Sequence, residues 1–202
     1  MPRATPVLRR ARKAIQDLDL LKILGSELNH ELSSMRYQDE KVGSFGDFVL
    51  EWDSSRSQDV LLRKKSSSGE EVAVSALLGR ETFQGDGRLL REALMKICVK
   101  KPGMSSILQF DCVASNRDSE LDFFIHNAYY IPSSSSLGSL IYRGPVFSDL
   151  DPSLQVELMR YLTARGIEEN FANSLLLYLH KKEQGQYTSW LQKLRDMIAE
   201  DE

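Results

Sequence analysis

Two helices meet at a tight corner near the C-terminus, in the stretch DPSLQVELMRYLTARGIEENFA at residues 151–172. Asp151 is a favourable helix N-cap, and Pro152 is tolerated in the first helical turn because its missing N–H has no partner there. Gly166 follows the last turn, where glycine accepts the left-handed conformation that ends many helices. The stretch therefore predicts an amphipathic helix, a corner at Arg165 and Gly166, and a second helix that runs almost to the terminus.

The two helices differ in how their apolar residues are arranged. In the first helix Leu154, Leu158 and Leu162 recur every four residues and form a single stripe. The second helix has apolar residues on more than one side, namely Phe171, Leu175, Leu176, Leu179, Trp190, Leu191, Leu194 and Ile198. This surplus predicts either a subunit interface or burial beneath a sheet of the same chain. Neither helix carries a reactive constellation, so both indicate packing or assembly.

The rest of the chain predicts one N-terminal helix followed by strands. From Asp17 onward, apolar residues spaced by three and four indicate an amphipathic helix: Leu18, Leu21, Leu24, Leu28, Leu32 and Met35. Seven segments are typical of antiparallel strands, at residues 48–52, 60–65, 72–78, 93–100, 104–114, 120–131 and 140–147. Lys101-Pro102-Gly103 is a tight hairpin signal. We expect an α+β fold with an antiparallel sheet.

Charge divides the chain into two parts. The 202 residues carry a net charge of −3, yet residues 1–16 hold five basic side chains and no acid. The remainder has 21 bases against 29 acids, a net charge of −8. An Arg-rich segment without acids is typical of a mitochondrial transit peptide, and a solvated basic tail is the alternative. We therefore predict a basic N-terminal segment at residues 1–16 and a single domain at residues 17–202.

Hydropathy and cysteine content bear on the compartment. The longest uninterrupted apolar run, Leu175 to Leu179, is five residues long, far short of the ~20 that cross a bilayer, so we expect no membrane insertion. Cys98 and Cys112 are too few for a disulfide framework and do not form a CxxC pair. They fit free thiols in a reducing compartment such as the mitochondrial matrix.

Several runs resemble the mitochondrial glycoprotein family, which is also described as mitochondrial acidic matrix protein. The C-terminal signature lies in Tyr161–Ala172 and Gln186–Leu194, with Arg165, Gly166, Ile167 and Phe171 at its corner. Weaker matches occur at Leu108–Cys112 and Leu121–Ile125, and the order of elements agrees from about residue 17. The animal members of this family bind many ligands, including a complement component.

The resemblance implies a fold, a location and a function. The fold is a twisted seven-stranded antiparallel sheet with the helices packed on one side, and three subunits form a doughnut-like homotrimer. The expected protein is a non-catalytic chaperone or adaptor of the mitochondrial matrix that supports mitochondrial translation and respiratory-chain assembly. Its acidic body attracts basic clients such as ribosomal or respiratory-chain proteins. We expect the helical layer and subunit contact at Leu21, Leu24, Leu28, Leu175, Leu179, Trp190 and Leu194.

No residue pattern indicates an enzyme or a bound cofactor. The three histidines, His30, His126 and His180, have no partner at the spacing of metal ligands. Phosphate-binding glycine motifs and a nucleophile elbow are absent from the sequence. The neighbouring acids Asp39-Glu40, Glu70-Glu71 and Glu168-Glu169 are expected to be solvated rather than to form an acid/base pair. A small hydrolase or metal-dependent enzyme is the least favoured alternative.

An RNA-binding or ribosome-associated module is the main alternative to the chaperone. In this hypothesis the basic turns contact RNA through Lys64, Lys65, Lys100 and Lys101. The acidic body and the lack of interleaved aromatic residues disfavour it, so contact with nucleic acid would be indirect. The chain also departs from strongly acidic family members, because the corresponding stretches are Ser-Asn-Arg-Asp-Ser-Glu at residues 115–120 and a serine run at residues 133–136. No ligand-binding residue is therefore transferred from the family.

Overall fold

The computed structural model describes residues 6–34, 41–80, 82–83, 89–117, 120–133, 142 and 144–199. The elements are α1 (Pro6–Ser33), β1 (Val49–Asp53), β2 (Val60–Lys65), β3 (Glu71–Leu78), β4 (Thr82–Phe83), β5 (Leu89–Leu90), β6 (Ala93–Lys100), β7 (Ile107–Arg117), β8 (Glu120–Ile131), a 3-10 helix η1 (Phe147–Asp149), α2 (Pro152–Thr163) and α3 (Glu169–Ala199). The chain divides into two compact units, and α3 contributes to both.

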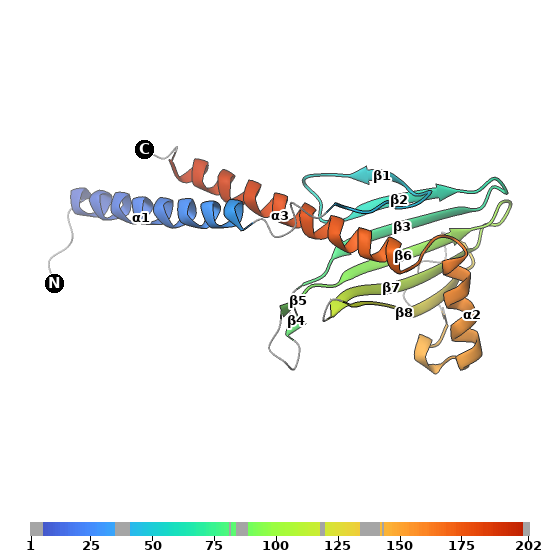
Figure 1. Ribbon diagram of the computed structural model, residues 1–202. Helices are drawn as coiled ribbons and strands as arrows, with labels where there is room; N and C mark the ends of the chain where they lie inside the picture. Colours follow the sequence, from blue (N-terminus) through green and yellow to red (C-terminus); the bar gives the residue numbers. More distant parts are fainter. Residues whose placement is uncertain are drawn as a thin grey trace. The chain divides into compact units, whose positions relative to one another are not determined.

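The larger unit, residues 40–180, contains a six-stranded antiparallel sheet (Figure 1). The strand order is β1-β2-β3-β6-β7-β8, and every neighbouring pair is antiparallel. Strands that follow one another are joined as hairpins, apart from the excursion between β3 and β6 that holds the small β4–β5 pair. The predicted turn before β7 is confirmed, since Met104 N–H donates to the carbonyl of Lys101 and Gly103 has a φ of +72°.

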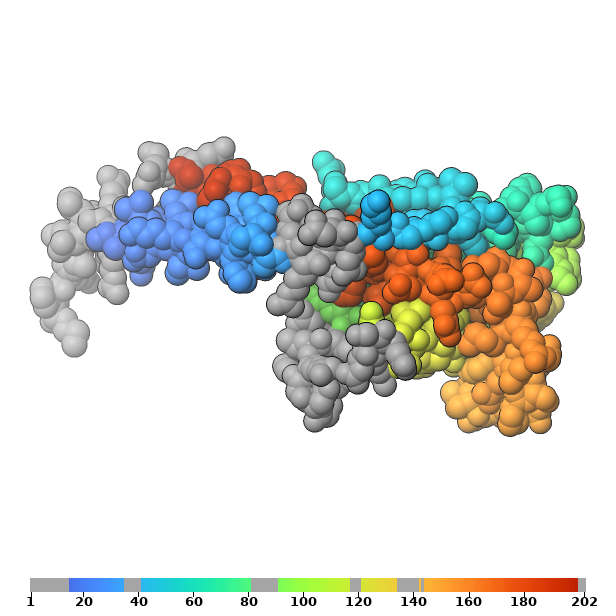
Figure 2. All heavy atoms as spheres, viewed as in Figure 1, coloured from blue at the N-terminus to red at the C-terminus, as the bar shows by residue number. Residues whose placement is uncertain are grey.

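One face of this sheet forms the core. In β6 the buried residues Ala93, Met95, Ile97 and Val99 alternate with Leu94 and Lys96, which are exposed. This period of two places one apolar row against the helices and leaves the other row on the opposite face. Residues of α2, of the corner after it and of the first part of α3 complete the same cluster: Leu162, Ile167, Phe171, Ala172, Leu175, Leu176 and Leu179. Figure 2 shows the orange side chains of this segment packed over the strands.

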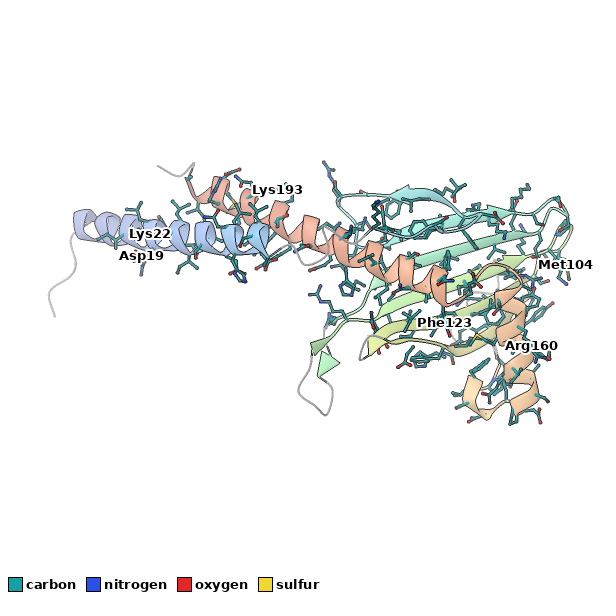
Figure 3. The ribbon with its side chains drawn as sticks, in the orientation of Figure 1. Asp19, Lys22, Met104, Phe123, Arg160 and Lys193 are labelled. Atoms are coloured by element: carbon teal, nitrogen blue, oxygen red, sulfur yellow. The ribbon has the colours of Figure 1, made fainter. Side chains whose placement is uncertain are left out.

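The smaller unit consists of α1 and α3 from Lys181 onward. Its core is a cluster of Leu24, Leu28 and Leu191, against which Tyr187, Leu194 and Ile198 pack. The Tyr187 hydroxyl donates a hydrogen bond of 3.1 Å to a carboxylate oxygen of Glu27, which links the two helices. Burial, followed by the contact with Glu27, raises the pKa of that hydroxyl. On the surface of α1, Asp19 and Lys22 form an exposed ion pair of 3.8 Å, and both are labelled in Figure 3.

Most of the predicted elements are confirmed, with three differences. The α+β class, the antiparallel sheet and the strands at residues 60–65, 93–100 and 120–131 match the sequence prediction. The first helix begins at Pro6 rather than near Asp17, so most of the basic N-terminal segment is helical. The predicted seventh strand at 140–147 lies partly outside the described residues. Within it, Val146 makes one isolated bridge to Asn127, and Phe147 begins η1.

The third difference concerns the long C-terminal helix. The sequence left open whether its surplus apolar residues form an interface or are buried beneath the sheet of the same chain. Residues 171–179 of α3 are buried against the sheet, with Leu175 and Leu179 at 0% and 1% exposure. Farther along, Leu191 is buried against α1, whereas Trp190 remains 55% exposed. Burial within the chain therefore explains the apolar residues in the first part of this helix.

We expect Leu175→Ala to destabilise the larger unit by about 2–5 kcal/mol, because it opens a cavity at a fully buried position. The measurement is the free energy of unfolding from urea denaturation followed by circular dichroism. Leu154→Ala, on the solvent-facing side of α2 with a 46% exposed side chain, is the matched control and should change it by about 0.5 kcal/mol or less. Equal losses for the two variants would contradict the assigned core.

Candidate functional site

The corner between α2 and α3 is closed by backbone hydrogen bonds around Gly166. The N–H of Gly166 donates to the carbonyl of Thr163 (2.9 Å), and the N–H of Ile167 donates to the carbonyl of Leu162 (3.1 Å). These two bonds form a Schellman motif, and Gly166 has the left-handed φ of +86° that the motif requires. The helix end predicted at this glycine is confirmed. Ile167, which follows it, is completely buried and anchors the corner in the core.

The helix that leads into the corner begins as predicted. Asp151 is the N-cap of α2, and its carboxylate accepts a hydrogen bond of 2.9 Å from the backbone N–H of Ser153. The Ser153 hydroxyl also donates to this carboxylate, and the two hydrogen bonds hold the pKa of Asp151 below its ordinary value. Pro152 occupies the first helical position. The start and the end of α2 are therefore both determined by local sequence.

Arg165 connects the corner to the sheet. Its Nη2 lies 2.8 Å from Oε2 of Glu70, and its Nη1 donates a bond of 2.8 Å to the carbonyl of Tyr161. The guanidinium also stacks on the Tyr161 ring, with its central carbon 3.4 Å from the ring centre. Burial raises the pKa of the Tyr161 hydroxyl, and the positive charge of Arg165 opposes this rise. The ion pair is largely buried, since Arg165 and Glu70 are 17% and 16% exposed.

A second cation secures the corner from the neighbouring strand. Lys64 of β2 donates a hydrogen bond of 3.3 Å from Nζ to the carbonyl of Arg165. The same ammonium lies 3.0 Å from a carboxylate oxygen of Asp47 and 5.7 Å from the centre of the Phe48 ring. Lys64 therefore takes part in packing, although the sequence suggested it as an RNA contact. The corner of α2 and α3 is tied to β2 and, through Glu70, to the start of β3.

The role of Glu70 corrects the expectation from sequence. We expected Glu70 and Glu71 to be solvated, but Glu70 is the partner of Arg165, and Glu71 lies 3.1 Å from Lys65. The contact with Lys65 holds the pKa of Glu71 below its ordinary value. The Arg165–Glu70 pair spans 95 positions in the sequence, so no local pattern could reveal it. Of the other acid pairs, Asp39-Glu40 lies outside the described residues, and Glu168 and Glu169 are exposed.

The seven residues predicted for a helical layer divide between the two units. Leu175 and Leu179 belong to the sheet core, whereas Leu24 and Leu28 are buried in the smaller unit, where Leu194 packs beside them. Leu21 is partly exposed. Trp190 is the most exposed member, and its ring is stacked on Tyr187 with centres 6.0 Å apart. The structure therefore places five of these residues in two separate clusters, and neither cluster includes Leu21 or Trp190.

The thiols and histidines occupy positions that suit packing. Cys112 is buried and Cys98 is partly buried, and burial raises the pKa of both thiols. A raised pKa keeps a thiol protonated, which lowers its reactivity as a nucleophile. His126 is exposed, with its ring against the edge of Phe124 at 4.9 Å between centres. Among the residues that the structure describes, no three His, Cys, Asp or Glu side chains gather as metal ligands.

Three of the four lysines suggested as RNA contacts gather at one end of the sheet. Lys65, Lys100 and Lys101 line a hollow of about 340 Å³ between the β2–β3 turn and the β6–β7 turn. Glu71 lies in the same hollow and offsets part of their charge. Figure 3 labels Met104 in the β6–β7 turn and thereby marks this end of the sheet. The hollow has excess positive charge in a body that is acidic as a whole.

A hollow of opposite charge lies beside the corner. Its volume is about 360 Å³, and the carboxylates on its lining are Glu168 and Glu169. Its apolar walls are Phe123 of β8, labelled in Figure 3, together with Met159 and Ile167. Apolar side chains and carboxylates in the same lining suit the aliphatic stem and charged head of a Lys or Arg side chain.

The face of the sheet opposite the helices has a third hollow, of about 410 Å³. Its lining includes the exposed Leu94 and the polar residues Lys96, Asp111 and His126. Lys96 and Asp111 are direct cross-strand partners in the β6–β7 register, so their charges offset one another. This hollow therefore has little net charge with which to select a partner.

Among the described residues, no helix combines the length and the apolar character needed to cross a bilayer.

We expect Arg165→Met to lower the free energy of unfolding by about 2–4 kcal/mol, because it leaves the largely buried Glu70 carboxylate without its cation. Glu70→Gln keeps a hydrogen-bond acceptor and should cost about 1 kcal/mol. The control is Arg160→Met, which breaks an exposed pair with Glu157 and should cost less than about 0.5 kcal/mol. Urea denaturation measures all three variants, and equal effects of Arg165→Met and Arg160→Met would refute a structural role of the pair.

Comparisons with solved structures identify the fold. The crystal structure of the Trypanosoma brucei p22 protein superimposes with a TM-score of 0.70 at 20% identity, covering 91% of this chain and 99% of that one. A hypothetical Leishmania major protein, described as a sequence homologue of human p32, gives a TM-score of 0.68 at 18% identity with the same coverage. Both likenesses extend over nearly the whole chain.

Sequence comparisons identify the family. An uncharacterised mitochondrial protein of Arabidopsis thaliana is 22% identical over 191 residues, which are 90% of this chain and 74% of that protein. The mitochondrial acidic protein mam33 of Schizosaccharomyces pombe is 35% identical over 57 residues, 28% of this chain and 21% of that protein. The sequence model of the mitochondrial glycoprotein family matches residues 89–198, which include the Arg165-Gly166 corner. This match confirms the resemblance seen in the sequence, and the chain belongs to the mitochondrial glycoprotein family.

Proposed function

We propose that this protein acts without catalysis as a chaperone or adaptor that binds basic partner proteins in the mitochondrial matrix. Its clients would be ribosomal and respiratory-chain proteins, and its role would be to support mitochondrial translation and respiratory-chain assembly. Family membership is the observation that carries this proposal. The two relatives described above are named as mitochondrial, and one of them is also named as acidic.

The charge of the chain supports basic partners. Outside residues 1–16 the net charge is −8, which attracts cationic proteins over distances set by the ionic strength. The hollow at the corner adds a local feature, because Glu168 and Glu169 line it together with the apolar side chains of Phe123 and Met159. A basic side chain of a client can place its stem on Phe123 and Met159 and its charge near these carboxylates. Residues 1–16 would serve as the import sequence.

The smaller unit supports assembly into a homotrimer. Apolar side chains beyond residue 16 are exposed on both of its helices: Leu18, Ile23 and Leu32 on α1, and Trp190 and Met197 on α3. Such exposure on one small unit is typical of a subunit interface. Leu24 and Leu28 are already buried within the chain, so Trp190 and the exposed residues of α1 are better placed to form the contact.

We expect sedimentation equilibrium at micromolar concentration to give three times the 23.0 kDa mass of the chain. Ile23→Lys, at a position that is 65% exposed, should shift this mass towards the monomer because it buries a charge in the contact. Val156→Lys, on α2 and 50% exposed, is the matched control and should leave the mass unchanged. A wild-type protein that remains monomeric would exclude the trimer.

We expect the immobilised protein to retain ribosomal or respiratory-chain proteins from a mitochondrial extract, and to release them as salt is raised. Combining Glu168→Gln with Glu169→Gln should reduce retention several-fold at physiological salt. The matched control removes two exposed acids elsewhere, through Asp19→Asn and Glu157→Gln. Mass spectrometry identifies the retained proteins. An unselective set of basic proteins, or none, would contradict the proposal.

The gathering of Lys65, Lys100 and Lys101 in one hollow favours RNA binding as a second candidate function. The same assay separates the two candidates when a labelled single-stranded RNA replaces the extract. If RNA binding exists and depends on these lysines, changing all three to Gln should weaken it and reduce its salt dependence. Changing the exposed Lys22 and Lys193 to Gln is the control.

A further inference from the structure

The outer edge of β1 is an unusual feature of the larger unit. β1 ends the sheet and pairs only with β2, and in the described residues no strand lies beyond it (Figure 1). All five residues of β1 are exposed. Three of them are large and apolar, with exposures of 68% for Val49, 36% for Leu50 and 43% for Trp52. Exposed apolar edge strands promote pairing with other chains, and native proteins usually protect them.

The opposite edge of the same sheet, at β8, is partly covered by the same chain. β8 pairs with β7 on its inner side, and on its other side Asn127 forms an isolated antiparallel bridge with Val146. Residues of η1 also contact β8, and Phe147 of η1 is buried in the core. The chain therefore covers part of one edge with its own backbone. The edge at β1 presents alternate N–H and C=O groups to a partner.

Side chains hold β1 firmly on the sheet. Glu51 lies 2.7 Å from the Arg63 side chain of β2, and the Tyr178 hydroxyl of α3 donates a bond of 2.5 Å to Asp53. Burial, together with this bond, raises the pKa of the Tyr178 hydroxyl to about 12, so the phenol remains a donor at neutral pH. A strand that is already in place loses little conformational entropy when a partner strand pairs with it.

The charges of β1 decide between two occupants. If a second copy aligned its whole β1 antiparallel to this one, Glu51 would face Glu51, and like charges directly opposite one another are destabilising. A strand with Lys or Arg across from Glu51 and Asp53, and apolar residues across from Leu50 and Trp52, would be complementary at each of these positions. The edge thus fits an extended segment in which basic and apolar residues alternate.

We propose that the outer edge of β1 is a docking site where an extended, basic segment of a partner protein adds as a further strand. This proposal rests on the proposed function for the class of partner, and it adds the place and mode of binding. Backbone hydrogen bonds along β1 supply affinity, and the side chains of Val49, Glu51, Trp52 and Asp53 select the segment.

Trp52 allows strand addition to be observed directly. The chain has two tryptophans, so in a Trp190→Phe variant Trp52 is the only reporter of emission. The probe is a capped peptide of about nine residues in which Lys and Val alternate. We expect saturable binding with a blue shift of Trp52 emission, because the added strand shields the indole from water. In the matched Trp52→Phe variant, Trp190 should show no shift.

Two peptide controls test the mode of binding. Replacing every Val by Pro keeps the charge but removes backbone donors, and should weaken binding by about tenfold or more. Replacing every Lys by Glu should abolish binding at low salt. On the protein, Val49→Lys should weaken peptide binding by a similar factor. Leu154→Lys, which also replaces an exposed apolar residue by lysine, should not weaken it. Hydrogen exchange should slow at residues 49–53 when the Lys-Val peptide is bound.

The outcomes separate this inference from the proposed function. Equal binding of the Lys-Val and Lys-Pro peptides, or binding unaffected by Val49→Lys, overturns the docking site but leaves the capture of basic clients intact. If Val49→Lys dissolves an oligomer and the peptide does not bind, the edge is a contact between copies, and the inference is wrong. Failure to retain any mitochondrial client contradicts the proposed function itself.

Discussion

The ion pair between Arg165 and Glu70 is the interaction on which the arrangement of the larger unit depends. One face of the sheet is apolar along β2, β3, β6 and β7, so it must be covered. The cover consists of α2 and the first part of α3, whose directions are set by the corner at Gly166. The corner keeps its position because Arg165 reaches the start of β3 and Lys64 reaches back from β2. Local turn chemistry and a long-range ion pair thus act at the same residues.

The sequence predicted those elements whose signals are local. Alternation in β6 and the Pro-Gly turn after it are properties of short segments, and so are the N-cap at Asp151 and the glycine that ends α2. The prediction of a seventh strand was wrong in the part of it that the structure describes. There, Val146 makes a single bridge, and a 3-10 turn that buries Phe147 follows it. The start of α1 at Pro6 was missed because the apolar period begins only near Asp17.

The candidate sites were less predictable, because they depend on which distant segments meet. Lys64 and Lys65 are adjacent, yet side chains alternate along a strand, so Lys64 packs under the corner while Lys65 joins Lys100 and Lys101. The alternation of side chains along β2 would have been enough to predict that Lys64 and Lys65 lie on opposite faces of the sheet. The partnership of Arg165 with Glu70 required the fold. The division of α3 into two buried faces likewise required knowing that its first part lies on the sheet and that Leu191 packs on α1.

The two edges of the sheet differ in how far the same chain covers them. A bridge and a 3-10 turn cover part of β8, whereas the protection seen at β1 within the described residues is a bulge at Glu51 and two acidic side chains. Acidic residues and bulges on an edge discourage pairing with identical chains. In the docking proposed above, the same acidic residues would favour a basic strand, so the features that discourage pairing between two β1 edges would also select the partner. For the basic clients proposed above, an apolar edge that carries two carboxylates would discriminate by charge before any backbone bond forms.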